Sequence, residues 1–298
     1  MQALPEKSSS PDRYVVYGDL GERDTAALAT AMIAKQIPFE VVPESASLSW
    51  ALASRAGHET GPYLRTPEGF VLAGTLPILD WLERVRPSLA LLPGTATPVR
   101  RVCARLLEDW ILAWLPFWPR RSWETVNELG SHLGTSGFLL GASVTRPDLL
   151  LAAWLESDVI VHEHARGQLA KDAPRLLQFG DAVLEANLNE AEDDVIPISL
   201  TKVLARMARD YHVYLERNQR AIKGGADHVE LDLGFGSQRL PVRRVCEARR
   251  AALGRDLASL SRETRRDVRQ VLEPVGAWHV LTLPPVLEVI DPSDPRSL

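Results

Sequence analysis

Apolar and polar positions in the first part of the chain alternate between strand-like and helix-like patterns. Tyr14–Tyr17 and Phe39–Val42 are short β-branched and aromatic runs, which predict strands. Residues 23–35 place Leu28, Met32 and Ile33 among alanines, which predicts a helix between these strands. A second, shorter helix is expected over residues 46–55.

A hairpin and a third helix are predicted next. Residues 62–65 and 70–72 flank the sequence Thr-Pro-Glu-Gly at 66–69, which is a good turn. Residues 77–86 then have a helical pattern, with Pro77 tolerated in the first turn. The order strand, helix, strand, helix, strand, strand, helix predicts a mixed sheet with helices packed on it, an α/β domain over residues 14–92.

The pattern becomes helical after residue 92. Val102, Leu106, Trp110 and Trp114 recur every four residues within 98–115. The sequence Pro-Gly-Thr-Ala-Thr at 93–97 predicts a linker between two domains, and an all-α domain is expected over residues 98–298. Its further helices are expected at 122–135, 147–161 and 173–191.

The tail extends the helical domain. A helix is expected near 197–223, ended by Gly224-Gly225. Residues 229–233 alternate with period two, and with residues 239–242 they predict a small hairpin over 229–242. One or two arginine-rich helices should cover 243–273, with interleaved acidic residues typical of a solvated face.

The amino-acid composition limits the expected partners and the expected cellular compartment of the protein. The 298 residues carry a formal net charge of −5, which argues against a nucleic-acid partner. Cys103 and Cys246 are the only cysteines, so a reducing cytoplasm is expected. Residues 1–13 are polar and are expected to form a disordered arm. No apolar run approaches the length of a membrane span.

Two motifs point to a known architecture. Gly61-Pro62 precedes the third predicted strand, and Thr145-Arg146-Pro147-Asp148 follows a loop ending at Gly141. The second motif has the spacing of a capping box, in which Thr145 accepts from the third backbone N–H and Asp148 accepts from the N–H of Thr145. Together these segments resemble the two halves of the glutathione transferase family. The resemblance implies a thioredoxin-like domain followed by an all-α domain, a cis bond before Pro62, a homodimer, and glutathione as a substrate.

The resemblance places Glu22 and Arg23 at the family's active position, at the start of the first helix. A carboxylate there complements the helix dipole but repels a thiolate, and Arg23 would offset part of this. Tyr17, at the end of the first strand, is the remaining donor to a glutathione thiolate. The alternative for Tyr17 is a core tyrosine at a strand end.

Glutathione binding is expected at two dipeptides. The backbone of Gly61, before Pro62, would pair with the tripeptide as an added strand. Gly74-Thr75 stands where the family has an acidic residue followed by Ser or Thr, so the hydroxyl is kept and the acid is lost. Thr75 would hold a carboxylate of the ligand, unless it serves only as a helix N-cap.

The resemblance also assigns Trp110, Trp114 and Trp118 to the pocket for a hydrophobic second substrate. Packing in a core or a dimer interface is the preferred alternative for these tryptophans. His162-Glu163-His164 is a poor chelate because residues two apart on a helix point to different faces, so no metal is expected.

Two functions follow. The first is a glutathione transferase-like enzyme that conjugates glutathione to a hydrophobic electrophile, favoured by Tyr17, Pro62 and Thr75. The alternative is a non-catalytic binding or scaffold protein with the same fold, favoured by Glu22 and Gly74.

Overall fold

The computed structural model describes residues 13–117, 123–186, 193–232 and 236–286, so residues 1–12 of the expected N-terminal arm lie outside the described part. The chain divides into two compact units. The first contains Met1–Leu92 and Ser143–Glu190, and the second contains Pro93–Ala142 and Ala191–Leu298.

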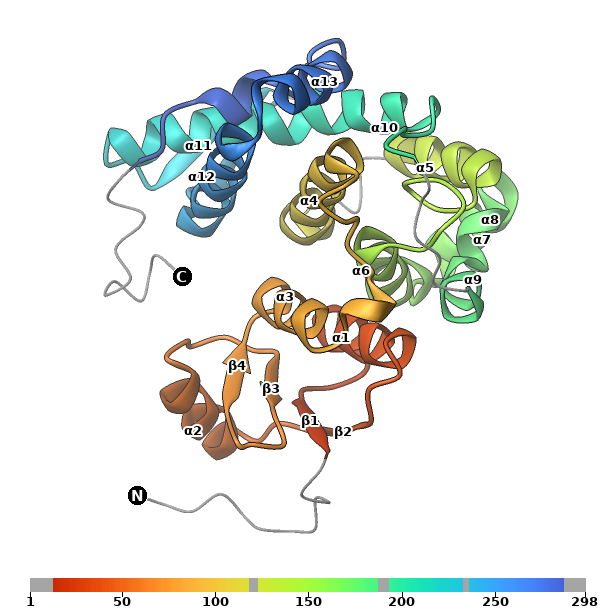
Figure 1. Cartoon of the computed structure of the whole chain (residues 1–298), viewed down its shortest axis with the longest axis vertical. Coiled ribbons are helices and arrows are strands. Elements are labelled where there is room, and N and C mark those ends of the chain that lie inside the picture. Colours follow the sequence, from red (N-terminus) through yellow and green to blue (C-terminus); the bar gives the residue numbers. More distant parts are fainter. Residues whose placement is uncertain (1–12, 118–122, 187–192, 233–235, 287–298) are drawn as a thin grey trace. The chain divides into compact units, whose positions relative to one another are not determined.

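The first unit begins with the predicted α/β arrangement (Figure 1). Strand β1 is parallel to β2 and antiparallel to β3, which is antiparallel to β4, so the sheet order is β2-β1-β3-β4. This is a thioredoxin-like sheet, and the predicted order of strands and helices is confirmed. The elements are β1 Tyr14–Tyr17, α1 Arg23–Ala34, β2 Phe39–Val42, α2 Ala46–Ala56, β3 Tyr63–Arg65, β4 Val71–Ala73 and α3 Thr75–Val85, followed by the 3₁₀ turn Pro87–Leu89.

The pleat of β1 sends alternate side chains to opposite faces of the sheet. Val15 and Tyr17 pack with Leu52 of α2 and Tyr63 of β3 in one buried cluster. Val16, fully buried, points to the other face. Helix α1 packs against α3. Both faces of this short sheet are therefore covered, which fixes the strand register.

Four helices from later in the sequence complete the first unit, and α6 packs against α1. The expected helix over 147–161 is α6 Arg146–Trp154, continued by the π-helical segment Leu155–Ile160. The expected helix over 173–191 is instead two short ones, α8 Pro174–Leu177 and α9 Phe179–Glu185, because Gln178 leaves the helical region with φ −106° and ψ 5°.

Helix α7, Glu163–Asp172, was not predicted from the sequence. Leu169 is its one buried residue, so it lacks the apolar repeat that identifies an amphipathic helix. The start of α6, by contrast, has the expected chemistry. Its capping box is present, with the Thr145 backbone N–H donating to Asp148 Oδ2 at 2.8 Å and the Thr145 hydroxyl donating to the same oxygen at 2.7 Å.

The second unit is helical with one hairpin. The strands β5 and β6 pair antiparallel, with Val229 opposite Leu240, as predicted for this part of the tail. The turn residues 233–235 lie outside the described part. The elements are α4 Pro98–Ala113, the 3₁₀ turn Leu115–Phe117, α5 Trp123–Ser136, α10 Leu200–Met207, the π-helical segment Ala208–His212, α11 Val213–Lys223, β5 His228–Asp232, β6 Ser237–Pro241, α12 Arg244–Ser259, α13 Arg262–Leu272 and the 3₁₀ turn His279–Thr282.

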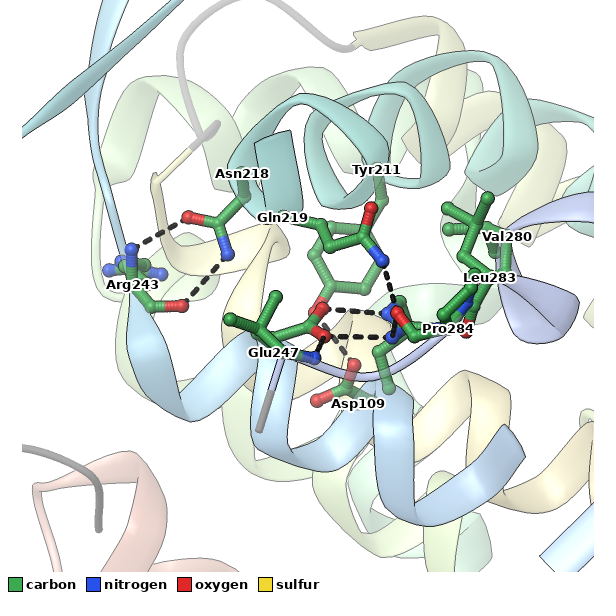
Figure 2. Close-up of polar contacts among 11 residues, drawn as sticks. Asp109, Tyr211, Asn218, Gln219, Arg243, Glu247, Val280, Leu283 and Pro284 are labelled. Atoms are coloured by element: carbon green, nitrogen blue, oxygen red, sulfur yellow. Dashed lines mark hydrogen bonds and ion pairs between the residues drawn. The ribbon is translucent and has the colours of Figure 1, made fainter. Parts of the chain in front are cut away.

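A buried ion pair anchors the end of the described chain in the second unit. Arg250 and Glu247 on α12 have fully buried side chains, with Arg250 Nε 2.7 Å from Glu247 Oε2. The Arg250 guanidinium also donates to the carbonyls of Val280 and Leu283, at 2.9 and 3.0 Å. Glu247 Oε1 accepts from the backbone N–H of Val286 at 3.1 Å. Figure 2 shows Glu247 beside Val280, Leu283 and Pro284, so this pair secures residues 280–286.

Further buried polar contacts join α11 and the π-helical segment before it to their neighbours in the same unit (Figure 2). The amide of Asn218 donates to the carbonyl of Arg243 at 2.9 Å and accepts from the N–H of Arg243 at 2.8 Å. The Tyr211 hydroxyl donates to Asp109 Oδ2 at 2.7 Å. These bonds give partners to the Asn218 amide and the Tyr211 hydroxyl inside the unit. Within the described ranges, no helix has the length and apolar character needed to span a membrane.

Candidate functional site

Several of the predicted site residues lie at one end of the sheet of the first unit. The strand register places Tyr17 opposite Tyr63, and Tyr63 opposite Ala73. Pro62 immediately precedes Tyr63, and Gly74 immediately follows Ala73. The N–H of Gly74 donates to the carbonyl of Pro62 at 3.0 Å. The structure therefore brings Tyr17, Gly61-Pro62 and Gly74-Thr75 together, and the Gly61-Pro62 bond is cis.

Helix α3 begins at this end of the sheet without a capping side chain. Gly74 occupies the N-cap position with φ 83° and ψ 141°, a conformation that L residues rarely adopt. The alternative that Thr75 is the N-cap is therefore wrong, because Thr75 is already the first helical residue. Since no side chain of the described residues accepts from the first N–H groups of α3, these donors and the helix dipole are available to an anion.

Tyr17 combines a buried ring with an unpaired hydroxyl. Its side chain is 7% exposed and belongs to the cluster between the sheet and α2. Within the described part of the chain, its hydroxyl makes no hydrogen bond. The Tyr17 oxygen is not one of the fully buried, unpartnered atoms of the described chain, so solvent reaches this hydroxyl and its donor is open to a ligand.

The start of α1 is electronegative. Glu22 is its N-cap residue and is exposed, without a side-chain capping bond. Arg23 Nε lies 2.9 Å from Asp24 Oδ1, and its Nη1 lies 3.7 Å from Asp158 Oδ2. Burial raises the pKa of Asp158, and the charge of Arg23 opposes this rise. Two carboxylates thus share the one guanidinium, which leaves little positive charge to stabilise a thiolate.

Asp158 was not identified from the sequence. It lies in the π-helical segment after α6, far from Arg23 along the chain, and no local spacing pattern connects the two. Segments of π-helix occur often at functional sites, so the π-helical backbone around Asp158 is a structural indication of a role for this residue.

Two of the tryptophans predicted for a hydrophobic pocket, Trp110 and Trp114, are core residues of the second unit. Trp110 is 1% and Trp114 is 4% exposed. The ring centroid of Trp114 lies 5.6 Å from that of Tyr211 and 5.3 Å from that of Tyr214. Trp118 lies outside the described residues. Trp110 and Trp114 therefore contribute to packing, and a pocket role for them is left as a proposal.

The cysteines offer no reactive thiolate. Cys103 and Cys246 are both buried and free of disulfides. Burial raises the pKa of the Cys103 thiol to about 12. Burial is also the main cause that raises the pKa of the Cys246 thiol to about 11. Both thiols are consequently protonated at neutral pH, and any thiolate chemistry would have to use the thiol of a ligand. No group of three or more metal-ligating side chains is assembled by the residues that the structure describes.

The chain resembles solved structures, but comparison of its sequence with family models and curated proteins finds no match. A glutathione S-transferase from Rhodospirillum rubrum is 17% identical with a TM-score of 0.47, over 64% of this chain and 92% of that one. Rice GST1, in complex with glutathione, is 21% identical with a TM-score of 0.47, over 59% and 92% of the two chains. A glutathione S-transferase from Methylobacterium radiotolerans, in complex with glutathione sulfonate, is 19% identical with a TM-score of 0.40, over 62% and 99%.

At these identities and TM-scores the comparisons support no conclusion about function. The fold class rests on the chain itself, on the sheet order β2-β1-β3-β4, the cis bond before β3 and the capped helix α6. A thioredoxin-like sheet followed in sequence by helices is the architecture that the sequence predicted. The predicted fold class is confirmed.

Proposed function

We propose that this chain is a glutathione transferase-like protein that binds glutathione at one end of its sheet, where β3 begins and β4 ends. The observation that supports this is the convergence of Gly61-Pro62 with the uncapped start of α3 at Gly74-Thr75, joined by the hydrogen bond from Gly74 to Pro62. One segment offers extended backbone and the other offers N–H donors. A peptide with a carboxylate at one end needs both.

The binding mode follows from these groups. The backbone of Gly61 pairs with the cysteinyl residue of glutathione, as an additional strand would. The first N–H groups of α3 and the Thr75 hydroxyl receive the γ-glutamyl carboxylate. Gly74 supplies no carboxylate for the ligand's amino group.

The proposed reaction is the attack of the glutathione thiol on a hydrophobic electrophile. A free thiol is mostly protonated at neutral pH, so the site must lower its pKa. The Tyr17 hydroxyl, unpaired in the described chain, is the proposed donor to the thiolate. A cytoplasmic homodimer is proposed on the same resemblance, and sedimentation equilibrium would test the dimer.

A non-catalytic binding protein is the second candidate. The observation that favours it is the exposed Glu22 carboxylate at the N-cap of α1, together with Asp24 and Asp158, which share Arg23 as their cation. Such a helix start opposes a thiolate, because like charges raise the free energy of the ionised form. Titration calorimetry with glutathione, combined with the thiolate absorbance against pH, separates the candidates. Binding with a lowered thiol pKa supports the enzyme, binding without it supports the second candidate, and no binding at millimolar concentration rejects both.

Thr75→Ala is expected to weaken glutathione binding by about 1–3 kcal/mol, since a hydrogen bond to a charged group is lost. Calorimetric titration of the wild type and the variant measures the difference. Thr30→Ala is a matched control, because the Thr30 hydroxyl donates only to Ala26 within α1. Equal affinities of the Thr75 variant and the wild type would exclude the proposed carboxylate site.

Tyr17→Phe is expected to retain glutathione binding and to raise the pKa of the bound thiol, because the phenol donates to the thiolate only. Ultraviolet absorbance of the thiolate against pH measures this. The change removes one oxygen from a buried ring, so circular dichroism should show an unchanged fold. An unchanged thiol pKa in this variant would assign Tyr17 to the core alone.

A further inference from the structure

One carboxylate lies directly against the proposed backbone-pairing segment. Glu44 Oε1 would lie 3.1 Å from a Cβ atom added to Gly61, so the exposed Glu44 carboxylate lies beside Gly61 on the side where a side chain would project. The Ser49 hydroxyl donates to Glu44 Oε2 at 2.5 Å and so holds the carboxylate in place. Burial raises the pKa of Tyr63, and the charges of Glu44 and then Glu59 add to the rise. Two carboxylates thus act on the first residue of β3.

These charges are not neutralised by basic residues. Within the described ranges, neither Glu44 nor Glu59 belongs to an ion pair. Arg23, at the start of α1, is already shared by Asp24 and Asp158. An anion that approaches Gly61 therefore meets uncompensated negative charge, which a cation would find favourable.

The strand order sets which end of a ligand meets Glu44. Thr75 follows β4, on one side of β3, whereas Glu44 follows β2, which lies on the other side of β3 beyond β1. A tripeptide paired with Gly61, with its γ-glutamyl carboxylate at Thr75, extends its opposite end toward Glu44. In glutathione that end is the glycine carboxylate, and the two anions would repel each other.

We propose that Glu44 determines specificity at this site, and that the preferred ligand is a glutathione-type thiol peptide whose glycine end carries a cationic amine in place of the free carboxylate. This inference rests on the proposed function, because it uses the binding mode at Gly61 and Thr75. Glu44 selects by charge: it attracts an ammonium group and repels a carboxylate.

The test compares two probes by titration calorimetry. One is glutathione, and the other is glutathione amidated at its glycine carboxylate with ethylenediamine, which ends in an ammonium group. The amine probe is expected to bind wild-type protein at least fivefold more tightly, and higher salt should reduce this preference. Glu44→Gln should weaken the amine probe and strengthen glutathione, each by about fivefold.

Glu163→Gln is the matched control, because it removes the same charge from an exposed position on α7 and should leave both affinities unchanged. Equal binding of both probes, or tighter binding of glutathione, with no effect of Glu44→Gln, overturns this inference and leaves the proposed function standing. If neither probe binds to the wild-type protein at millimolar concentration, the proposed function fails, and the inference fails with it.

Discussion

Arg250→Met is expected to lower the free energy of unfolding by about 3–5 kcal/mol, because it leaves the Glu247 carboxylate buried without its cation. Both side chains are fully buried, and a second contact joins Arg250 Nη2 to Glu247 Oε1 at 2.8 Å. The variant also loses the donors to the carbonyls of Val280 and Leu283, so residues 280–286 should detach first. Urea unfolding followed by circular dichroism measures the loss.

Two further variants separate charge from packing. Arg255→Met, one turn further along α12 at an exposed position, should change the unfolding free energy by no more than about 0.5 kcal/mol. Glu247→Leu combined with Arg250→Met removes both charges and should recover part of the loss, as buried pairs replaced together often do. A single Arg250 variant as stable as the Arg255 control would show that the pair is dispensable.

Stability is expected to fall as pH decreases from about 6.5, with His212 as a major cause. His212 is 4% exposed, and neither ring nitrogen has a hydrogen-bond partner within the described chain. Burial alone lowers its pKa to about 3. Above pH 6.5 the imidazole is neutral in both states. Below pH 6.5, His212 binds a proton in the unfolded chain but stays neutral in the folded one. The free energy of unfolding therefore falls by about 1.4 kcal/mol per pH unit, or about 2 kcal/mol at pH 5.

Replacing this histidine tests the assignment. His212→Leu should flatten the loss between pH 6.5 and 5, and it should be at least as stable as the wild type at pH 5, because no orphaned polar atom remains. His164→Leu, at an exposed position on α7, should keep the wild-type slope. Burial also lowers the pKa of His132, so some slope persists in the His212 variant. An identical slope in His212→Leu and the wild type would contradict the prediction.

The sheet and its first helices could be predicted because their signals are local. The turn at 66–69 and the β-branched runs at 14–17 and 39–42 determine strand positions without reference to distant contacts. Helix α7 was missed because its stability comes from neighbours rather than from an apolar stripe. The π-helical segments Leu155–Ile160 and Ala208–His212 also have no sequence signature that periodicity could detect.

The candidate site was predicted only where the resemblance supplied positions. Gly61-Pro62 and Gly74-Thr75 were found because each has a place in a known order of elements. The ion pair of Asp158 with Arg23 and the position of Glu44 beside Gly61 depend on how distant segments pack, and they could not be derived from spacing along the chain. Both carboxylates add negative charge beside residues of the proposed site, and neither one was identified from the sequence alone.

The backbone geometry at Gly74 restricts which residues can replace this glycine. With φ 83° and ψ 141°, any L residue at position 74 would cost about 1–3 kcal/mol in backbone strain. Space is not the obstacle, since an added Cβ would lie 3.5 Å from the nearest atom, on Pro77. A single substitution that introduces an acidic residue at position 74 would therefore also destabilise the fold. A second change in the turn between β4 and α3 would be needed to relieve that strain, so the lack of a carboxylate at position 74 is tied to the backbone geometry of this turn.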